Sequence, residues 1–275
     1  MARVTSSLAR DARFLGLSGI SLPDRLRLTL AKYGVRARSF TRLPPKATFR
    51  FAGRTYHVSE PGDLALLQRV LVDTHEYLEV FGLIGKPAIS AVDVGAHNGE
   101  TAIAWSMFMR DPQIQSFEPD PVPYHNAQRN LQGITSALHD VGLSDRTGHA
   151  PFDVQRGHGG DATFVLGEST RTSPALVRIA RGDDILAGTS PDLIKIDVEG
   201  YEGHVIEGLK ETLSGCRYLT IEVSLSRPKD HHFHELAAAL SKHRFELIGV
   251  GRPHGVTASR QDAVDLHFVQ ADDTA

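Results

Sequence analysis

The sequence has almost no cysteine and no long apolar run. Cys216 is the only cysteine among 275 residues, which excludes an intramolecular disulfide and argues against a cysteine-built zinc site. No apolar run approaches the roughly 20 residues of a membrane-spanning helix. Arg10, Asp11 and Arg13 also interrupt the stretch where a secretory signal needs an uncharged core. We therefore expect a cytoplasmic protein without a transmembrane segment.

Acidic residues are scarce at the start of the chain. Residues 1–60 hold 12 Lys/Arg and 3 Asp/Glu, a balance of +9, whereas the remainder has a balance of −12. Such asymmetry can mark contact with nucleic acid or with a membrane. Because these basic residues are scattered, we expect them to lie against the acidic body or a second subunit. We predict no nucleic-acid partner, and a peripheral membrane contact through residues 1–60 and a homo-oligomer both stay open.

From residue 88 onward, short apolar runs alternate with helical stretches. The runs are 88–95, 114–119, 135–143, 192–198, 217–223, 245–250 and 265–271, and the helices are predicted at 99–109, 121–131, 202–213 and 232–243. This alternation is typical of an α/β fold with helices on both faces of a parallel sheet. The loop before the last run is too short for a crossover helix, which favours an antiparallel strand. We predict a Rossmann-like, mostly parallel seven-stranded sheet with an antiparallel last strand.

The first 82 residues follow a different pattern. Residues 1–45 contain helical pieces, residues 47–58 read as a hairpin around Ala52-Gly53, and residues 63–81 have helical periodicity. We assign residues 1–82 to an N-terminal helical and hairpin segment that packs on the core, and residues 83–275 to a cofactor-binding domain. Residues 148–190 are less regular and look like an insertion beside the third strand.

The strongest motif is AVDVGAHNGET at residues 91–101, where a strand ends in a glycine turn and a helix begins. Gly95 and Gly99 remove side chains where backbone must approach a ligand, and the helix start presents free N–H groups. Asp93 can accept a hydrogen bond from a ligand ammonium. We assign these three residues, with Ala96 and Asn98 of the turn, to a cofactor site. The alternative is a tight turn without a ligand.

An acidic residue follows at the spacing of nucleotide-binding folds. Glu118 ends the next predicted strand, 23 residues after the first glycine of the turn, and a carboxylate there can accept from both ribose hydroxyls. Pro119 is assigned to the same site. Asp120 is a competitor, but before Pro121 it can cap a helix instead. Asp140 and Val141 follow the third strand and are candidates to border an adenine, whereas Glu118 could also be a solvated strand end.

The turn sequence separates two classes of cofactor. The dinucleotide fingerprint needs a second glycine where backbone approaches a pyrophosphate, and here Ala96 and His97 occupy that place. The motif therefore favours a cofactor without pyrophosphate. An NAD-dependent oxidoreductase on a similar sheet remains one alternative, and a non-catalytic scaffold protein with a cofactor pocket remains another.

Carboxylates gather where two later strands end. Asp197 and Glu199 follow one apolar run and Glu222 ends the next, and ligands of open α/β sheets bind at that edge. The candidate general bases are Asp197, Glu199, His204 and His97. The carboxylates could instead hold a divalent cation, and Asp197 could support the cofactor.

A histidine cluster is a second-choice metal site. His231, His232 and His234 follow Pro228 and precede an alanine-rich helix. Adjacent histidines in that setting are more typical of a polar loop and a helix start. We therefore assign no metal ligand.

Several ordered motifs between about residues 70 and 250 resemble the FkbM-type methyltransferases. The matching runs are VDVGAHNGETAI, SFEPDPVPYHNAQRNL, LSDRTGHAPF, DLIKIDVEGYEGHVIEGL and YLTIEVS. The stretch ARGDDIL at 180–186 departs from that family's usual Thr-Leu-Asp-Asp, and Tyr201 and His204 replace smaller residues. These departures lie toward the acceptor side, so acceptor identity is the least determined property.

The resemblance implies S-adenosylmethionine-dependent O-methylation of a small hydroxylated acceptor, such as a sugar, a polyketide or a related metabolite. By position it places Asp93, Gly95 and Glu118 at the cofactor. It places Asp197 and Glu199 beside the reacting centre.

Overall fold

Seven strands form the central sheet of the computed structural model, which describes residues 2–40, 48–58, 62–134, 136–153, 163–164, 175–224, 233–251 and 263–271. The strand order is β12-β13-β11-β10-β3-β4-β5. The strands are β3 (Ser90–Val94), β4 (Gln113–Phe117), β5 (Ser136–His139), β10 (Leu193–Ile196), β11 (Tyr218–Ser224), β12 (Phe245–Val250) and β13 (Ala263–Gln270). His231 and His232 of the histidine cluster lie outside the described residues.

Strand direction in this sheet follows the prediction. β3 pairs in parallel with β4 and β10, and β4 with β5. β13 lies antiparallel between β11 and β12. The carboxyl ends of the parallel strands therefore share one edge, where ligands of open α/β sheets bind. The predicted α/β class and antiparallel last strand are confirmed.

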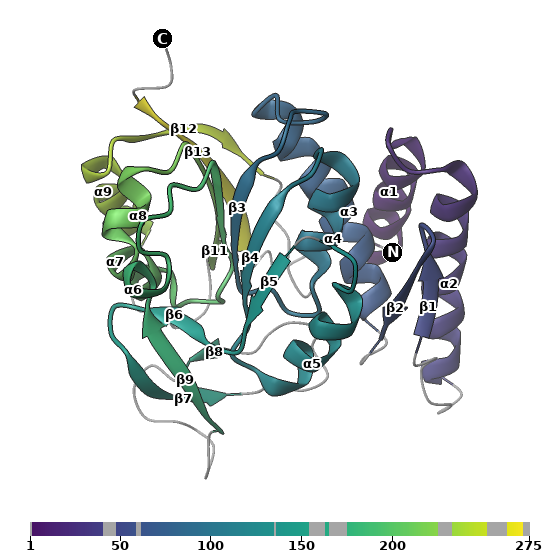
Figure 1. Cartoon of the computed structure of the whole chain (residues 1–275). Coiled ribbons are helices and arrows are strands. Elements are labelled where there is room, and N and C mark those ends of the chain that lie inside the picture. The colour runs from purple at the N-terminus through teal and green to yellow at the C-terminus, as the bar shows by residue number, and fades with distance from the viewer. Residues whose placement is uncertain are drawn as a thin grey trace.

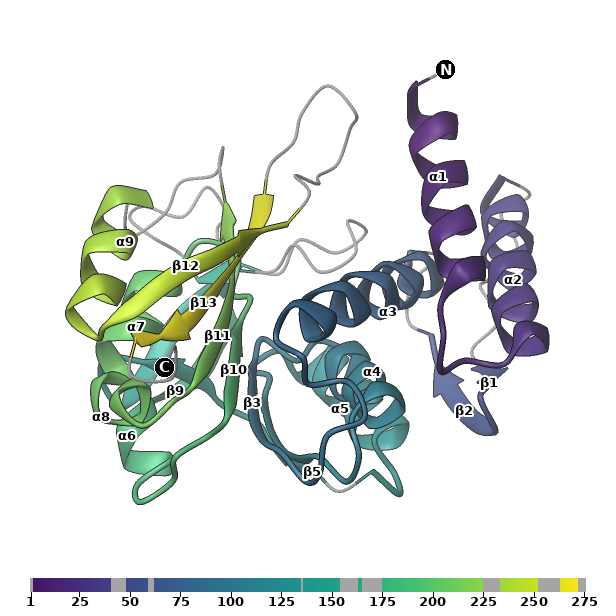
Figure 2. The same cartoon turned by 90° about the horizontal axis from the view of Figure 1, so that it is seen from above.

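Helices cover both faces of the sheet (Figures 1 and 2). One face carries α3 (Asp63–Val80), α4 (Glu100–Phe108) and α5 (Pro121–Asn130), and the other carries α6 (Gly182–Ile185), α7 (Glu202–Gly208), α8 (Lys210–Ser214) and α9 (Phe233–Lys242). Side chains alternate along each strand, so Ala91 and Val92 of β3 enter two separate buried clusters. The helix predicted over 202–213 divides at Leu209, which ends α7 and caps α8.

A second, four-stranded sheet contains the strands that the structure describes within the predicted insertion at 148–190. Its order is β6-β9-β7-β8, made of β6 (Gly142–Ser144), β7 (Gly148–Asp153), β8 (Thr163–Phe164) and β9 (Ala175–Arg181). The sequence predicts a single strand over the apolar run 135–143. It divides instead, because β5 pairs with β4 while β6 leaves the central sheet and pairs with β9.

The N-terminal elements pack on the outer side of α3 (Figure 2). They are α1 (Ala2–Gly16), α2 (Leu22–Phe40) and the hairpin of β1 (Thr48–Phe51) with β2 (Arg54–His57), and the hairpin confirms its prediction. Lys32 of α2 donates hydrogen bonds to Asp11 of α1 and to Gln68 of α3, so part of the basic segment pairs within the chain. The boundary at residue 82 stays a prediction. Among the described helices, none has the length and apolar character to cross a bilayer.

Candidate active site

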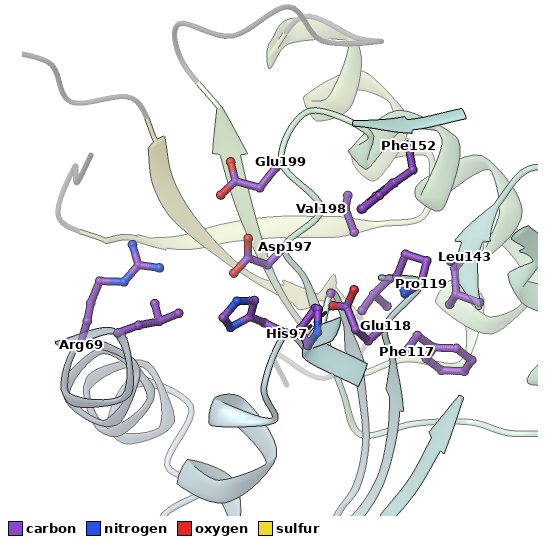
Figure 3. Close-up of a pocket in the computed structure, with 15 residues that line it drawn as sticks. Arg69, His97, Phe117, Glu118, Pro119, Leu143, Phe152, Asp197, Val198 and Glu199 are labelled. Carbon is purple, nitrogen blue, oxygen red and sulfur yellow. Dashed lines mark hydrogen bonds between the residues drawn. The ribbon is translucent and has the colours of Figure 1, made fainter. Parts of the chain in front are cut away.

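A pocket of about 750 Å³, including its space open to solvent, lies at the carboxyl edge of the central sheet. In Figure 3, Arg69 lies at one end and Phe117, Leu143 and Phe152 at the other, with His97 and Glu118 between them and Asp197 and Glu199 along one side. The remaining lining residues are Leu66, Val94, Gly95, Pro119, Pro123, Gly142 and Val198. The pocket thus has one charged end and one largely apolar end.

The glycine turn is held tightly against the neighbouring strands. The N–H groups of Gly95 and Ala96 both donate to the carbonyl oxygen of Phe117 at 3.0 Å. Gly95 has a φ of 90°, and a Cβ on it would lie 1.9 Å from the carbonyl oxygen of Asp197. Only glycine satisfies both the left-handed backbone and this contact. The residue is therefore required for the turn to touch the β10 end, whatever binds there.

His97 follows in the same turn and belongs to a polar network. Its Nδ1 lies 3.2 Å from Oε1 of Glu100, and the Tyr56 hydroxyl of β2 donates to that same oxygen at 2.6 Å. Burial lowers the pKa of His97, but the charge and hydrogen bond of Glu100, together with the charges of Glu118 and Asp63, outweigh it and raise that pKa to about 9. A histidine already protonated at neutral pH cannot take a proton. This raised pKa therefore makes His97 a weaker candidate for the general base than Asp197 or Glu199.

Glu118 faces the middle of the pocket and its carboxylate is fixed by backbone. Oε2 accepts from the N–H of His97 and Oε1 from the N–H of Asp120, both at 2.8 Å. The side chain is 6% exposed, and burial raises its pKa to about 7. Asp120 accepts from the N–H of Val122 at 2.9 Å and caps α5, so its side chain has the structural role considered from the sequence.

The other residues assigned to the cofactor lie behind or beside the pocket. Asp93 is fully buried, and neither of its carboxylate oxygens has a hydrogen-bond partner among the described residues. Burial raises its pKa to about 7, although the charge of Lys195 opposes that shift. Ala96 and Asn98 are buried within the turn, and Gly99 caps α4 with a φ of 88°. These four residues shape the turn and are not part of the pocket lining.

At the apolar end of the pocket, the lining residues are the neighbours of Asp140 and Val141, the pair assigned to an adenine from the sequence. Asp140 is 61% exposed and its Oδ1 accepts from Arg178 at 2.9 Å on the surface, while Val141 is buried. Gly142 and Leu143 line the pocket instead. The chain leaves the central sheet at this point, so the residues that face the ligand space come from β6.

Two of the three residues assigned to catalysis meet at the pocket. Asp197 and Glu199 line it, and each offers a carboxylate oxygen within 4.8 Å of one on Glu222. Lys195 Nζ donates to Asp197 Oδ2 at 2.7 Å. Glu199 has a φ of 55°, a costly conformation for a residue with a side chain, and such strain often marks a functional site.

His204 is placed apart from these carboxylates. Its Nδ1 lies 3.3 Å from Asp145, and its ring stacks on Tyr201 with centroids 4.3 Å apart. It is not among the residues that line the pocket. Its assignment to catalysis has no geometric support within the described part of the chain.

Some residues that line the pocket are not predicted by any motif in the sequence. Leu66 and Arg69 come from α3, and Phe152 comes from β7. Helical periodicity predicts that α3 packs on the core, but it does not reveal that one of its turns overhangs the sheet edge. No local motif marks Phe152 either, because its position depends on how the second sheet folds over the first.

Known proteins share this set of motifs. The model of the methyltransferase FkbM domain family matches residues 93–247. A 2-O-methyltransferase, NoeI of Sinorhizobium fredii, is 30% identical over 164 residues, which cover 53% of this chain and 68% of that protein. A hexuronic acid methyltransferase, AglP of Haloferax volcanii, is 24% identical over 144 residues, which cover 50% of this chain and 57% of that protein. A solved FkbM methyltransferase from Methylobacillus flagellatus aligns with a TM-score of 0.46 and 16% identity, covering 90% of this chain and 60% of that one.

Proposed function

Because the chain belongs to the FkbM methyltransferase family, we propose that it transfers the methyl group of S-adenosylmethionine to a hydroxyl oxygen of a sugar. The family match covers more than half of the chain. A sugar is favoured over other hydroxylated acceptors because a hexuronic acid methyltransferase is among its relatives. The chain spans less than two thirds of that relative's length, so the acceptor class is part of the proposal.

One observation carries this function: Gly95 and Glu118 face a single pocket with chemically different ends. S-adenosylmethionine has an apolar aromatic base at one end, a ribose in the middle and a zwitterionic amino acid at the other end. Leu143 and Phe152 offer an apolar site for the base, and Glu118 offers acceptors for the ribose hydroxyls (Figure 3). The amino acid would then lie near Gly95, between the charged side chains.

The chemistry of the lining residues matches that cofactor. The Glu118 carboxylate is already oriented by two backbone N–H groups, and each of its oxygens keeps a further lone pair. Asp197 and Glu199 offer negative charge beside the place expected for the ammonium and the sulfonium. When bound, S-adenosylmethionine supplies an electrophilic methyl group on a positively charged sulfur.

The protein's own contribution to the chemistry is positioning and proton removal. Asp197 or Glu199 accepts the proton of the acceptor hydroxyl as its oxygen forms the new bond to carbon and the carbon–sulfur bond breaks. Lys195 binds Oδ2 of Asp197 and thereby fixes the orientation of that carboxylate. A positioned base contributes about 10²- to 10⁴-fold to the rate, and holding the oxygen in line with the methyl carbon contributes through proximity.

A divalent cation at Asp197, Glu199 and Glu222 is the alternative for this edge. The cations of Lys195 and Arg69 lie among these carboxylates and compensate part of their charge. We therefore propose proton transfer to a carboxylate without a metal. Turnover that is unchanged by a chelator is the expected result, and a loss that added Mg²⁺ restores would favour the metal-assisted route.

Calorimetry with S-adenosylhomocysteine tests the cofactor assignment. We expect binding with one ligand per chain, and methyl transfer from labelled cofactor to at least one member of a panel of neutral and acidic sugars. The matched comparison is NAD, which should neither bind nor raise the melting temperature. Absence of S-adenosylhomocysteine binding at millimolar concentration would contradict the proposal, and binding without transfer to any sugar would favour a scaffold role.

A further inference from the structure

One cation reaches the pocket from outside the part of the chain that matches the family. Arg69 lies on α3, ahead of residues 93–247, and lines the pocket with a side chain that is 23% exposed. Figure 3 shows its guanidinium at the charged end, with His97 between it and Glu118. The end of the pocket farthest from Leu143 and Phe152 therefore presents a positive group.

This guanidinium is charged and only loosely paired. Its one ion pair within the described residues joins Nη2 to Oε2 of Glu222 at 3.8 Å, which is longer than a hydrogen bond. Burial lowers the pKa of Arg69, but Glu222, Asp73 and Asp197 outweigh it and raise that pKa, so the group stays protonated. A guanidinium has five N–H donors in a planar fork. Donors turned toward the pocket are available to the oxygens of a ligand.

The surroundings select the kind of anion. An arginine fork matches a carboxylate with two parallel hydrogen bonds. Asp197 and Glu199 lie along the side of the pocket next to this end (Figure 3), so a highly charged anion such as phosphate would be repelled by them. A carboxylate that belongs to a zwitterion avoids this penalty, because its cationic part can face the acids while its anionic part faces the arginine.

We propose that Arg69 forms a carboxylate-binding subsite at the charged end of the pocket. The proposal rests on the proposed function, since it assumes that the pocket holds the cofactor and the acceptor. Two sources share this chemistry: the amino-acid carboxylate of S-adenosylmethionine and the carboxylate of a uronic acid acceptor. Both would lie beside Asp197, where the methyl group is transferred.

A pair of ligands that differ in this group tests the cofactor source. S-adenosylhomocysteine has the amino-acid carboxylate, and 5′-methylthioadenosine keeps the adenosine but lacks the amino acid. In Arg69→Gln we expect the dissociation constant of S-adenosylhomocysteine to rise about 10- to 100-fold, the loss typical of a hydrogen bond to a charged group. The dissociation constant of 5′-methylthioadenosine in this variant should stay within about threefold of the wild-type value. Arg69→Lys keeps the positive charge but lacks the planar fork of donors. Its dissociation constant for S-adenosylhomocysteine should therefore lie between those of wild type and Arg69→Gln.

Comparing two ligands on one variant cancels any loss of folded protein. Arg27→Gln is the matched control, because Arg27 is an exposed arginine on α2 that pairs with Asp24. The melting temperature of each variant shows whether it folds. If Arg69→Gln does not fold, the Arg69→Lys variant carries the same comparison.

A kinetic arm tests the acceptor source. The ratio of kcat/KM for a uronic acid to that for the corresponding neutral sugar is measured in wild type and in Arg69→Gln. The ligand preference is the ratio of the dissociation constants of 5′-methylthioadenosine and S-adenosylhomocysteine. If the kcat/KM ratio drops in Arg69→Gln while the ligand preference stays unchanged, the subsite belongs to the acceptor. If both the ligand preference and the acceptor ratio match wild type, the inference is overturned. Wild-type protein that binds neither adenosyl ligand would instead overturn the proposed function, and the inference with it.

Discussion

The pH dependence of cofactor binding should report the protonation of Glu118. Burial holds the pKa of this carboxyl at about 7 in the ligand-free protein. Ribose hydroxyls donate hydrogen bonds to the ionised form and therefore bind it better than the protonated form. Binding lowers the pKa of Glu118 below its ligand-free value, so affinity must fall as pH drops through about 7.

The size of the effect follows from that pKa. The apparent dissociation constant scales as 1 + 10^(pKa − pH), provided that the bound pKa lies below the range studied. Between about pH 8 and about pH 6, S-adenosylhomocysteine should lose about tenfold in affinity, equivalent to about 1.4 kcal/mol. The α-amino and carboxyl groups of the ligand keep their charges over this range. The pKa of His97 lies at about 9, so its ring stays mostly protonated there.

Glu118→Gln is the decisive variant, measured by calorimetry at both pH values. It keeps the size of the side chain but cannot ionise, so it should bind more weakly at about pH 8 and show little further loss at about pH 6. Asp93 also has a pKa of about 7 and could contribute to the change of affinity with pH. The test is therefore the difference between the pH dependence of wild type and that of Glu118→Gln. Glu211→Gln, a change at a residue whose side chain is 79% exposed, should keep the wild-type slope. An equal slope in wild type and Glu118→Gln would refute the assignment of Glu118 to the ribose.

Three further changes have expected outcomes. Gly95→Ala places a Cβ 1.9 Å from the Asp197 carbonyl oxygen, so it should lower stability by about 2–4 kcal/mol and abolish S-adenosylhomocysteine binding; an unchanged melting temperature would contradict this. Asp197→Asn should lower kcat about 10²- to 10⁴-fold. Its charge also faces the place proposed for the ligand ammonium, so the dissociation constant of S-adenosylhomocysteine should rise too, but by a smaller factor; an equal loss in both would remove the division of roles. Burial lowers the pKa of His267 to about 4, so its folded form binds fewer protons than the unfolded chain and stability falls by up to about 3 kcal/mol as pH drops from about 6.5 to about 4. Urea unfolding of His267→Asn should show a smaller loss over that range, and a loss equal to that of wild type would contradict the burial argument.

The sheet and its cofactor turn were predictable because they are local. Strands of four to eight residues that alternate with helices, as β3, β4, β10 and β11 do, leave a periodic trace in the sequence. The left-handed turn after β3 requires glycine at position 95, and the acid that closes β4 comes at a fixed spacing. The antiparallel last strand also followed from local reasoning, since the loop before it is too short for a crossover.

The remaining differences come from contacts between distant segments. The run at 135–143 has one apolar pattern, but Ser136–His139 pairs with β4 whereas Gly142–Ser144 pairs with β9. That division depends on β9, a partner more than 30 residues further along the chain, as the pairing register shows. His204 lies near the motif in sequence, yet α7 directs its ring toward Asp145. Proximity along the chain therefore overstated its proximity to the pocket.

The residues that line the pocket come from two parts of the chain, the edge of the central sheet and helix α3. This division affects how the protein can select its ligands. The ends of β3, β4 and β10 supply Gly95, Glu118 and Asp197 to the pocket, all within the family match. Arg69 comes from α3, whose packing is shared with α1 and α2 through one buried apolar cluster. Tyr56 of the hairpin likewise holds Glu100, which in turn positions His97. The N-terminal elements thus contact the residues that hold Arg69 and His97 in place, and these two side chains add to the positive charge that Lys195 supplies from the sheet.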